Sequence, residues 1–134
     1  RSTPLYSSAA SDVYKRQATA SAGVKNFNIP HPTKEGKRLI YGCLEGPEYG
    51  VYVRGRLTGS NVITLPEYWT GLVHGESITV QMQPIGSRQH LIVEKFDHKE
   101  VHVIDSDDKP IDCFYTINGT RKDVDRLEVE QDAD

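Results

Sequence analysis

The sequence predicts an all-β fold, mainly an antiparallel β-sandwich, with one short helical turn near residues 66–72. Polar and apolar side chains alternate with a period of two along several segments, which is typical of strands that bury one face. Turn-forming residues separate those segments at short intervals. One segment begins with a proline in the manner of a helix start. Many short strands joined by turns indicate a pair of packed sheets.

The first alternating segment covers residues 49–57. The side chains predicted to face inward are those of Tyr49, Val51, Val53 and Leu57. Those predicted to face outward are Tyr52, Arg54 and Arg56. Tyrosine and arginine are enriched in protein interfaces, so these outward residues are candidates for a subunit or receptor contact.

Further strands are predicted at residues 77–83, 100–104 and 126–130. In the first of these, Ile78, Val80 and Met82 share one face, and in the last Leu127 and Val129 alternate with charged residues. Turn signals lie at residues 58–61, 84–87, 96–99, 105–108 and 118–119. Asn118-Gly119 is a strong short hairpin signal, and the spacing from Ser77 onward predicts consecutive hairpins.

The helical turn is predicted from Pro66, which suits a first helical turn, and from Glu67, whose charge suits the positive end of a helix. Seven residues do not form a stable helix alone, so this turn must pack on the sheets. Trp69 can supply that contact. Trp69 and Phe114 are therefore the predicted core aromatic residues.

The chain divides into four parts by composition. Residues 7–17 (SSAASDVYKRQ) match a translated sequencing adaptor, so residues 1–17 are interpreted as an adaptor artefact without a fold of their own. Residues 18–24 read as a linker, residues 25–130 as a single β domain, and residues 131–134 as an acidic tail that frays.

Charge and hydropathy narrow the classes of partner. The net charge is −3, and no basic stripe is present that would neutralise phosphates, so nucleic-acid binding is not expected. No apolar run approaches the roughly 20 residues that cross a bilayer, so membrane insertion is not expected either. Cys43 and Cys113 form neither a CxxC pair nor a disulfide framework, and we expect half-buried thiols on strands.

Candidate catalytic and metal-ligating residues are sparse. Glu45 and Glu48 flank Gly46-Pro47, and two carboxylates at such spacing could serve as acid and base in glycoside hydrolysis if a sugar cleft lay between them. The simpler interpretation of residues 45–48 is a structural turn. His98 and His102 lie on a turn and a strand, where their spacing does not chelate one ion. We predict no catalytic residue, no metal and no cofactor.

Several short motifs occur in a fixed order between Lys25 and Glu130. They are KNFNIPHP (25–32), LEGPE (44–48), VYVRG (51–55), LPEYW (65–69), PIG (84–86), CFY (113–115) and RKDVD (121–125). This ordered set resembles the C-terminal domain of tail-fibre and other virion structural proteins of tailed phages, especially the cyanophages and other marine myoviruses.

The resemblance implies a non-enzymatic structural domain of a phage tail fibre or appendage, located in the virion and assembled in the host cytoplasm. It would act in fibre assembly or host-surface attachment. Its partners would be other fibre subunits, with a homotrimer as the implied oligomer, or a host-surface glycan or protein. Two alternatives stay open. One is a glycan-cleaving or self-processing fibre domain that uses Glu45 and Glu48, and the other is an interaction module of a bacterial or prophage surface protein.

Overall fold

The computed structural model describes residues 25–133. The predicted adaptor (1–17) and linker (18–24) lie outside the described residues, as does the last residue of the acidic tail. The chain forms two compact units, Arg1–Leu44 and Glu45–Asp134. The predicted β domain over residues 25–130 includes described residues of both units.

The described part of the first unit is a β-hairpin. Its strands are β1 (Asn26–Pro30) and β2 (Arg38–Gly42), which pair antiparallel and set Phe27 opposite Tyr41. The two rings stack with their centroids 5.2 Å apart. Cys43 follows β2, and its side chain is exposed, so the prediction of a half-buried thiol on a strand is wrong for this residue.

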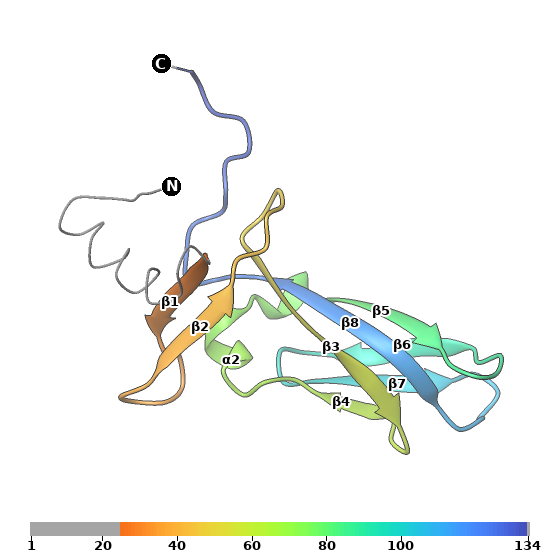
Figure 1. Cartoon of the computed structure of the whole chain (residues 1–134). Coiled ribbons are helices and arrows are strands. Elements are labelled where there is room, and N and C mark those ends of the chain that lie inside the picture. Colours follow the sequence, from red (N-terminus) through yellow and green to blue (C-terminus); the bar gives the residue numbers. More distant parts are fainter. Residues whose placement is uncertain (1–24, 134) are drawn as a thin grey trace. The chain divides into compact units, whose positions relative to one another are not determined.

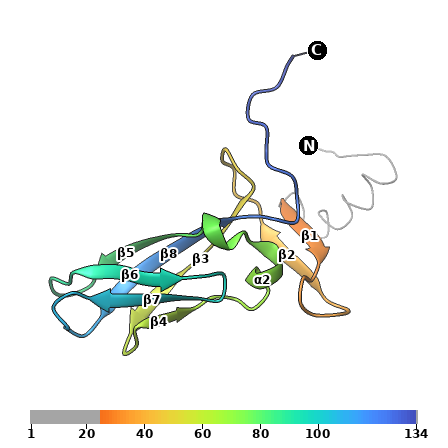
Figure 2. The same cartoon turned by 180° about the vertical axis from the view of Figure 1, so that it is seen from behind.

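The second unit contains two antiparallel three-stranded sheets (Figures 1 and 2), in the orders β3–β8–β5 and β4–β7–β6. The strands of the first sheet are β3 (Gly50–Thr58), β8 (Asp112–Thr120) and β5 (Thr79–Pro84). Those of the second are β4 (Val62–Thr64), β7 (Glu100–Asp105) and β6 (Leu91–Phe96). The all-β, sandwich-like prediction is confirmed.

The core of this unit takes alternate side chains from the two sheets. Those below 6% exposure include Val51 and Leu57 from β3, Cys113 and Ile117 from β8, Ile63 from β4, and Val101 and Val103 from β7. Such burial of inward residues on β3, β4, β7 and β8 is the physical consequence of the period-two pattern, and the inward residues of β5 and β6 are half-buried. The inward placement of Val51 and Leu57 agrees with the sequence.

The chain crosses repeatedly between the sheets. β5 pairs with β8 and β6 pairs with β7, so β6–β7 is the hairpin that the structure shows after Ser77. The prediction of consecutive hairpins from Ser77 onward is therefore wrong. A strand that pairs with the preceding strand and a strand that joins the facing sheet have the same alternation of side chains and the same turn residues. The sequence pattern therefore does not distinguish these two topologies.

The helical turn is present as α2 (Trp69–Leu72), followed by a short 3₁₀ turn, η1 (Gly75–Ser77). Backbone bonds begin at Pro66, whose carbonyl oxygen accepts from Trp69 N–H at 3.0 Å. Trp69 and Leu72 are completely buried. The turn therefore gains its stability from the core, as the sequence predicts.

Asn118 and Gly119 do not form a turn. They lie within β8, where Gly119 pairs with Val51. A Cβ atom on Gly119 would lie 2.5 Å from Val73 Cγ1. Glycine is required here because another segment packs directly on the backbone, and this tertiary reason overrides the local hairpin signal.

The strand predicted at residues 126–130 is also absent. Among the described residues, 121–133 contain only an isolated bridge, from Arg121 to Val73, and the chain beyond extends away from the sandwich (Figures 1 and 2). The Val129 side chain is 63% exposed. The alternating pattern is thus real, but none of the described strands pairs with it.

Candidate functional site

The outward surface of sheet β3–β8–β5 gathers the predicted contact residues. We call it the outer face. Its members, in rows set by the strand register, are Tyr52, Asn118 and Thr79; Arg54, Thr116 and Gln81; and Arg56, Phe114 and Gln83. The alternation that buries Val51 and Leu57 points Tyr52, Arg54 and Arg56 to solvent, as the sequence predicts.

Phe114 belongs to this outer face and not to the core. It lies opposite Arg56 on β8 and is 52% exposed, so its prediction as a core aromatic is wrong. Its neighbour Cys113 occupies the inward position instead and is fully buried. Burial raises the pKa of the Cys113 thiol. In the sequence, CFY contains three consecutive residues that are common in cores. Hydrophobicity alone therefore does not show which of them faces the core.

Two arginines on the outer face have different surroundings. Arg56 makes two hydrogen bonds of 2.9 Å to the carboxylate of Asp112. This pair lowers the pKa of Asp112 and raises that of Arg56. Arg54 has no hydrogen-bond or ion-pair partner within residues 25–133. The outer face therefore offers one uncompensated cation between Tyr52, which is 44% exposed, and Phe114.

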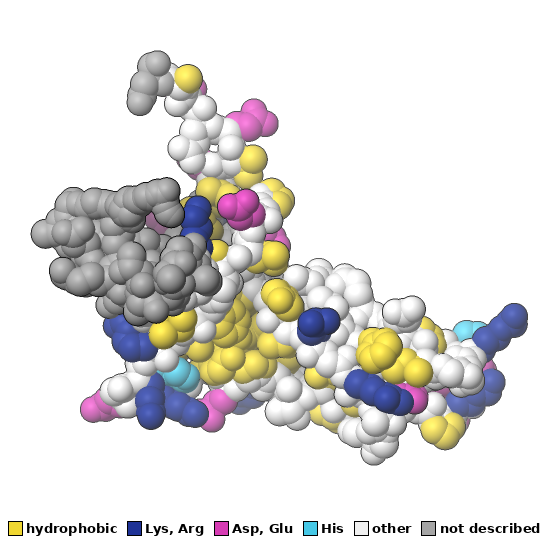
Figure 3. All heavy atoms as spheres, in the orientation of Figure 1, with side chains coloured by type: hydrophobic (Ala, Val, Ile, Leu, Met, Phe, Trp, Pro, Cys, Tyr) yellow, Lys and Arg dark blue, Asp and Glu magenta, His cyan; other side chains and the backbone are white. Residues whose placement is uncertain are grey.

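The molecular surface shows the same mixture of hydrophobic and basic side chains. Over the region where Figure 1 draws β3 and β8, Figure 3 shows hydrophobic and Lys or Arg side chains next to one another. Aromatic rings and guanidinium groups are the residue types that concentrate binding energy in protein interfaces. The arrangement suits surface recognition.

The Glu45–Glu48 segment forms a bend over residues 46–48 rather than a regular turn. Among the described residues, neither carboxylate has a hydrogen-bond or ion-pair partner. The nearby strand residue Arg56 binds Asp112 instead. Glu48 lines a hollow of about 320 Å³, whereas Glu45 is outside its lining. The structure thus does not place the two carboxylates around one cleft.

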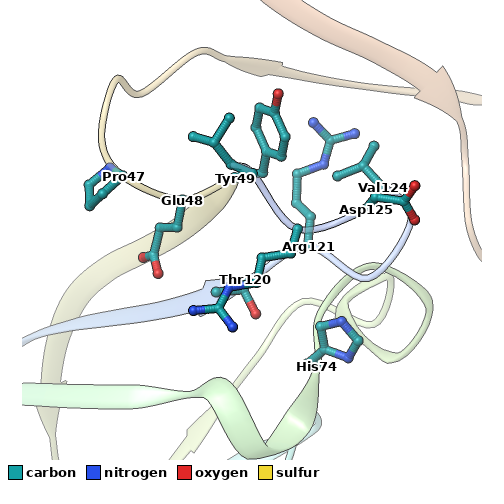
Figure 4. Close-up of a pocket in the computed structure, with 10 residues that line it drawn as sticks. Pro47, Glu48, Tyr49, His74, Thr120, Arg121, Val124 and Asp125 are labelled. Carbon is teal, nitrogen blue, oxygen red and sulfur yellow. The ribbon is translucent and has the colours of Figure 1, made fainter. Parts of the chain in front are cut away.

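That hollow lies at the end of the sandwich where β3 begins and β8 ends. Figure 4 shows Pro47 and Glu48 on one side, Val124 and Asp125 on the opposite side, and His74 on a third. Arg121 also lines it, with two bonds, of 2.9 and 2.6 Å, to the Asp123 carboxylate. The lining is mixed in charge, with Glu48 and Asp125 beside Arg121 and Arg126.

Metal-binding geometry is likewise not evident in the described part of the chain. Within residues 25–133, no three His, Cys, Asp or Glu side chains gather around a common point. His102 Nε2 lies 2.8 Å from Glu100 Oε1. His98 is placed in the β6–β7 turn, with its Nδ1 atom buried and without a hydrogen-bond partner. No helix in this part of the chain has the length and apolar character to span a bilayer.

Sequence reasoning missed two buried polar side chains that fix the loops at one end of the sandwich. Asp105 accepts hydrogen bonds from the backbone N–H groups of His90, Asp107 and Lys109. Gln89 both donates to the Asp112 carbonyl oxygen and accepts from Asp112 N–H. The spacing of Asp105 and Asp107 in a polar turn was the available signal, but the partner loop is distant in sequence.

No family model, no curated protein and no solved structure matches the chain. The ordered motifs, the sandwich-like fold and the outer face are therefore the features of this chain that point to a function.

Proposed function

We propose that this chain is a non-enzymatic structural domain of a phage tail fibre or appendage, and that its outer face contacts another fibre subunit. The main supporting observation is that Tyr52, Arg54 and Phe114 are exposed together on one face of one sheet. The ordered motifs support the assignment to a phage fibre, and the outer face supports contact with another subunit as the mode of action.

The composition of the face supports a protein partner. Tyrosine, phenylalanine and arginine are enriched at interface cores, and the remaining Thr, Asn and Gln side chains can form the hydrogen bonds of a rim. Arg54 requires an acceptor when it is covered, because an unpaired buried charge is costly. The chain has an excess of Asp and Glu over Lys and Arg, 19 against 16, so a second copy can supply that acceptor.

The test is self-association of the whole chain across a dilution series, measured by sedimentation velocity. The variant Arg54→Glu with Phe114→Ser should weaken association at least about tenfold, the effect of losing roughly 1.4 kcal/mol of contact energy. Ile92→Ser is the matched control, because Ile92 is similarly exposed but lies on the other sheet. It should leave association unchanged.

Other outcomes decide against the proposal. A chain that stays monomeric throughout, or a control that weakens association as much as the face variant, would overturn it. Binding to host cells that the face variant abolishes in a monomeric chain would move the function to host attachment. Glycan cleavage that Glu45→Gln with Glu48→Gln removes would establish the enzymatic alternative.

A further inference from the structure

The C-terminal acidic segment, residues 126–132 (RLEVEQD), has the pattern of a strand but no strand partner in the described chain. Leu127 and Val129 alternate with Glu128 and Glu130. The segment is not paired with any described strand, and Val129 is exposed. A period-two sequence that leaves its apolar side in water is expected to gain stability when it joins a sheet.

The packing of this segment in the single chain is loose. Two hollows, of about 320 and 400 Å³, are each lined by Tyr49 and by residues 124–127. Leu127 is only partly covered. The segment therefore buries little apolar surface beside Tyr49, and little burial free energy is lost when the segment moves elsewhere.

The sandwich has one long open edge. β4 has three residues, β6 contains a bulge between Val93 and Lys95, and β5 ends in Pro84. Short edges, bulges and prolines hinder the addition of another strand. β3 runs unbroken for nine residues, and β8 is its one partner among the described strands.

The backbone of β3 can accept a strand at the same residues that form the outer face. Arg121 N–H donates to the Tyr49 carbonyl oxygen at 2.9 Å, so Tyr49 and every second residue after it bond toward β8. The intervening residues, including Tyr52, Arg54 and Arg56, direct their N–H and C=O groups to the open edge. A strand added there sets its own outward side chains beside theirs.

The arginines of β3 favour an acidic strand as its partner. Pairing of two β3 edges about their centre would put Arg54 opposite its copy, which like-charge repulsion disfavours. An antiparallel acidic segment can instead set Glu130 opposite Arg54 and Glu128 opposite Arg56. The same register puts Leu127 beside Leu57 on the core side and Arg126 opposite Thr58.

We infer that the acidic segment of one copy adds as an antiparallel strand to the β3 edge of a second copy. This inference rests on the proposed assembly role and names its contact. Each copy then gives a strand to the next, a head-to-tail arrangement that closes into a ring when the rotation returns to the first copy. A homotrimer is one such ring.

The test is cross-linking between different chains in a Cys43→Ser background, which removes the exposed native thiol. Thr58→Cys is placed on one chain and Arg126→Cys on another chain that a tag makes heavier. These positions leave both predicted Arg–Glu pairs intact. The expected result under mild oxidation is a disulfide-linked pair of one light and one heavy chain. Ile92→Cys mixed with Arg126→Cys is the control, and it should not link.

A charge exchange gives a second measurement. Arg54→Glu alone and Glu130→Arg alone should each weaken association about tenfold, and the chain that carries both changes should recover it. Linking no faster than in the control, or no recovery in the double variant, would overturn strand exchange while self-association of the native chain upholds the assembly role. A native chain that never associates would end both proposals.

Discussion

The Asp105 carboxylate connects two loops of the sandwich. It accepts backbone hydrogen bonds from Lys109, His90 and Asp107, at 2.9, 2.7 and 3.0 Å, and the residue is 5% exposed. These bonds, that from Lys109 foremost, lower the pKa of Asp105. A carboxylate held by several N–H donors is stabilised in its charged form, so the folded state is linked to pH at this residue.

Replacing Asp105 should lower stability near neutral pH and flatten the acid response. The unfolded chain protonates first as the pH falls, because an unperturbed aspartate has a pKa of about 3.9. The stabilisation is therefore complete well above that value and lost as the pH falls through the lowered folded pKa. We expect Asp105→Asn to reduce the melting temperature by several degrees at pH 7, with a smaller difference at pH 3.

Circular dichroism melts at both pH values provide the measurement, with Asp132→Asn as the exposed control. Asp97 and Asp112 also have lowered pKa values, from backbone bonds of Glu100 and Lys99 and from the Arg56 pair respectively. The native chain thus keeps part of its acid sensitivity in either variant. Equal melting temperatures for Asp105→Asn and Asp132→Asn at pH 7 would show that the carboxylate does not secure the loops.

Gly119→Ala should destabilise the sandwich by about 1–3 kcal/mol, the usual cost of overpacking a core. The added Cβ would meet Val73 Cγ1 at 2.5 Å, although β8 backbone geometry itself admits alanine. Urea denaturation gives the free energy of unfolding. Gly46→Ala is the control, since nothing lies within 4 Å of its Cβ position. Combining Gly119→Ala with Val73→Ala should cost less than the two separate losses added together; strict additivity would argue against the clash.

At the scale of elements, α2 is a test of how far a four-residue helix depends on one side chain. Trp69 is completely buried, and Val73 N–H donates to its carbonyl oxygen. Trp69→Ala should cost about 3–5 kcal/mol, a large share of the 5–15 kcal/mol of a typical domain. The measurement is again urea denaturation, with the exposed Glu67→Gln as control. A loss below about 1 kcal/mol would mean that α2 is not anchored by this ring.

The elements also show what sequence patterns can and cannot supply. Alternation gave the strands at residues 49–57, 77–83 and 100–104, because burial of one face is a local property of each strand. It did not give their pairing, since β5 pairs with β8, which is distant in sequence, whereas β6 pairs with the next strand, β7. For the candidate site, the outward side of β3 was predictable from its alternation. Whether Phe114 faces outward depends on how β8 pairs with β3, which the sequence does not show.

Two of the incorrect sequence predictions have the same physical origin. Asn118-Gly119 satisfies a hairpin turn locally, and residues 126–130 satisfy a strand locally, yet tertiary partners decide both. Gly119 is held in β8 by the close approach of Val73. The acidic segment lacks a partner strand within the described chain. Local preference therefore does not decide an element when tertiary contacts favour another structure or when the partner strand is missing.

At the scale of the whole molecule, the buried side chains and the assembly contact fall on separate parts of the chain. The core residues of the sandwich lie between Val51 and Ile117. The acidic segment follows them and contributes no buried side chain. Folding and assembly are therefore expected to be separable, since removing the segment exposes none of the core.

A chain that ends at Asp123 should fold like the native chain and fail to assemble. It keeps the Arg121–Asp123 ion pair and the bond of 2.8 Å from Lys122 N–H to the Leu72 carbonyl oxygen, so the end of β8 stays fixed. We expect its free energy of unfolding to stay within about 0.5 kcal/mol of the native value, as for changes outside the core, and its sedimentation to be that of a monomer.

The full-length variant Glu128→Gln with Glu130→Gln is the length-matched control. It should associate weakly, and its association should depend less on salt than that of the native chain, because its Arg–Glu pairs are gone. Assembly that survives truncation would place the contact wholly on the outer face, and unfolding on truncation would make the acidic segment part of the folded core.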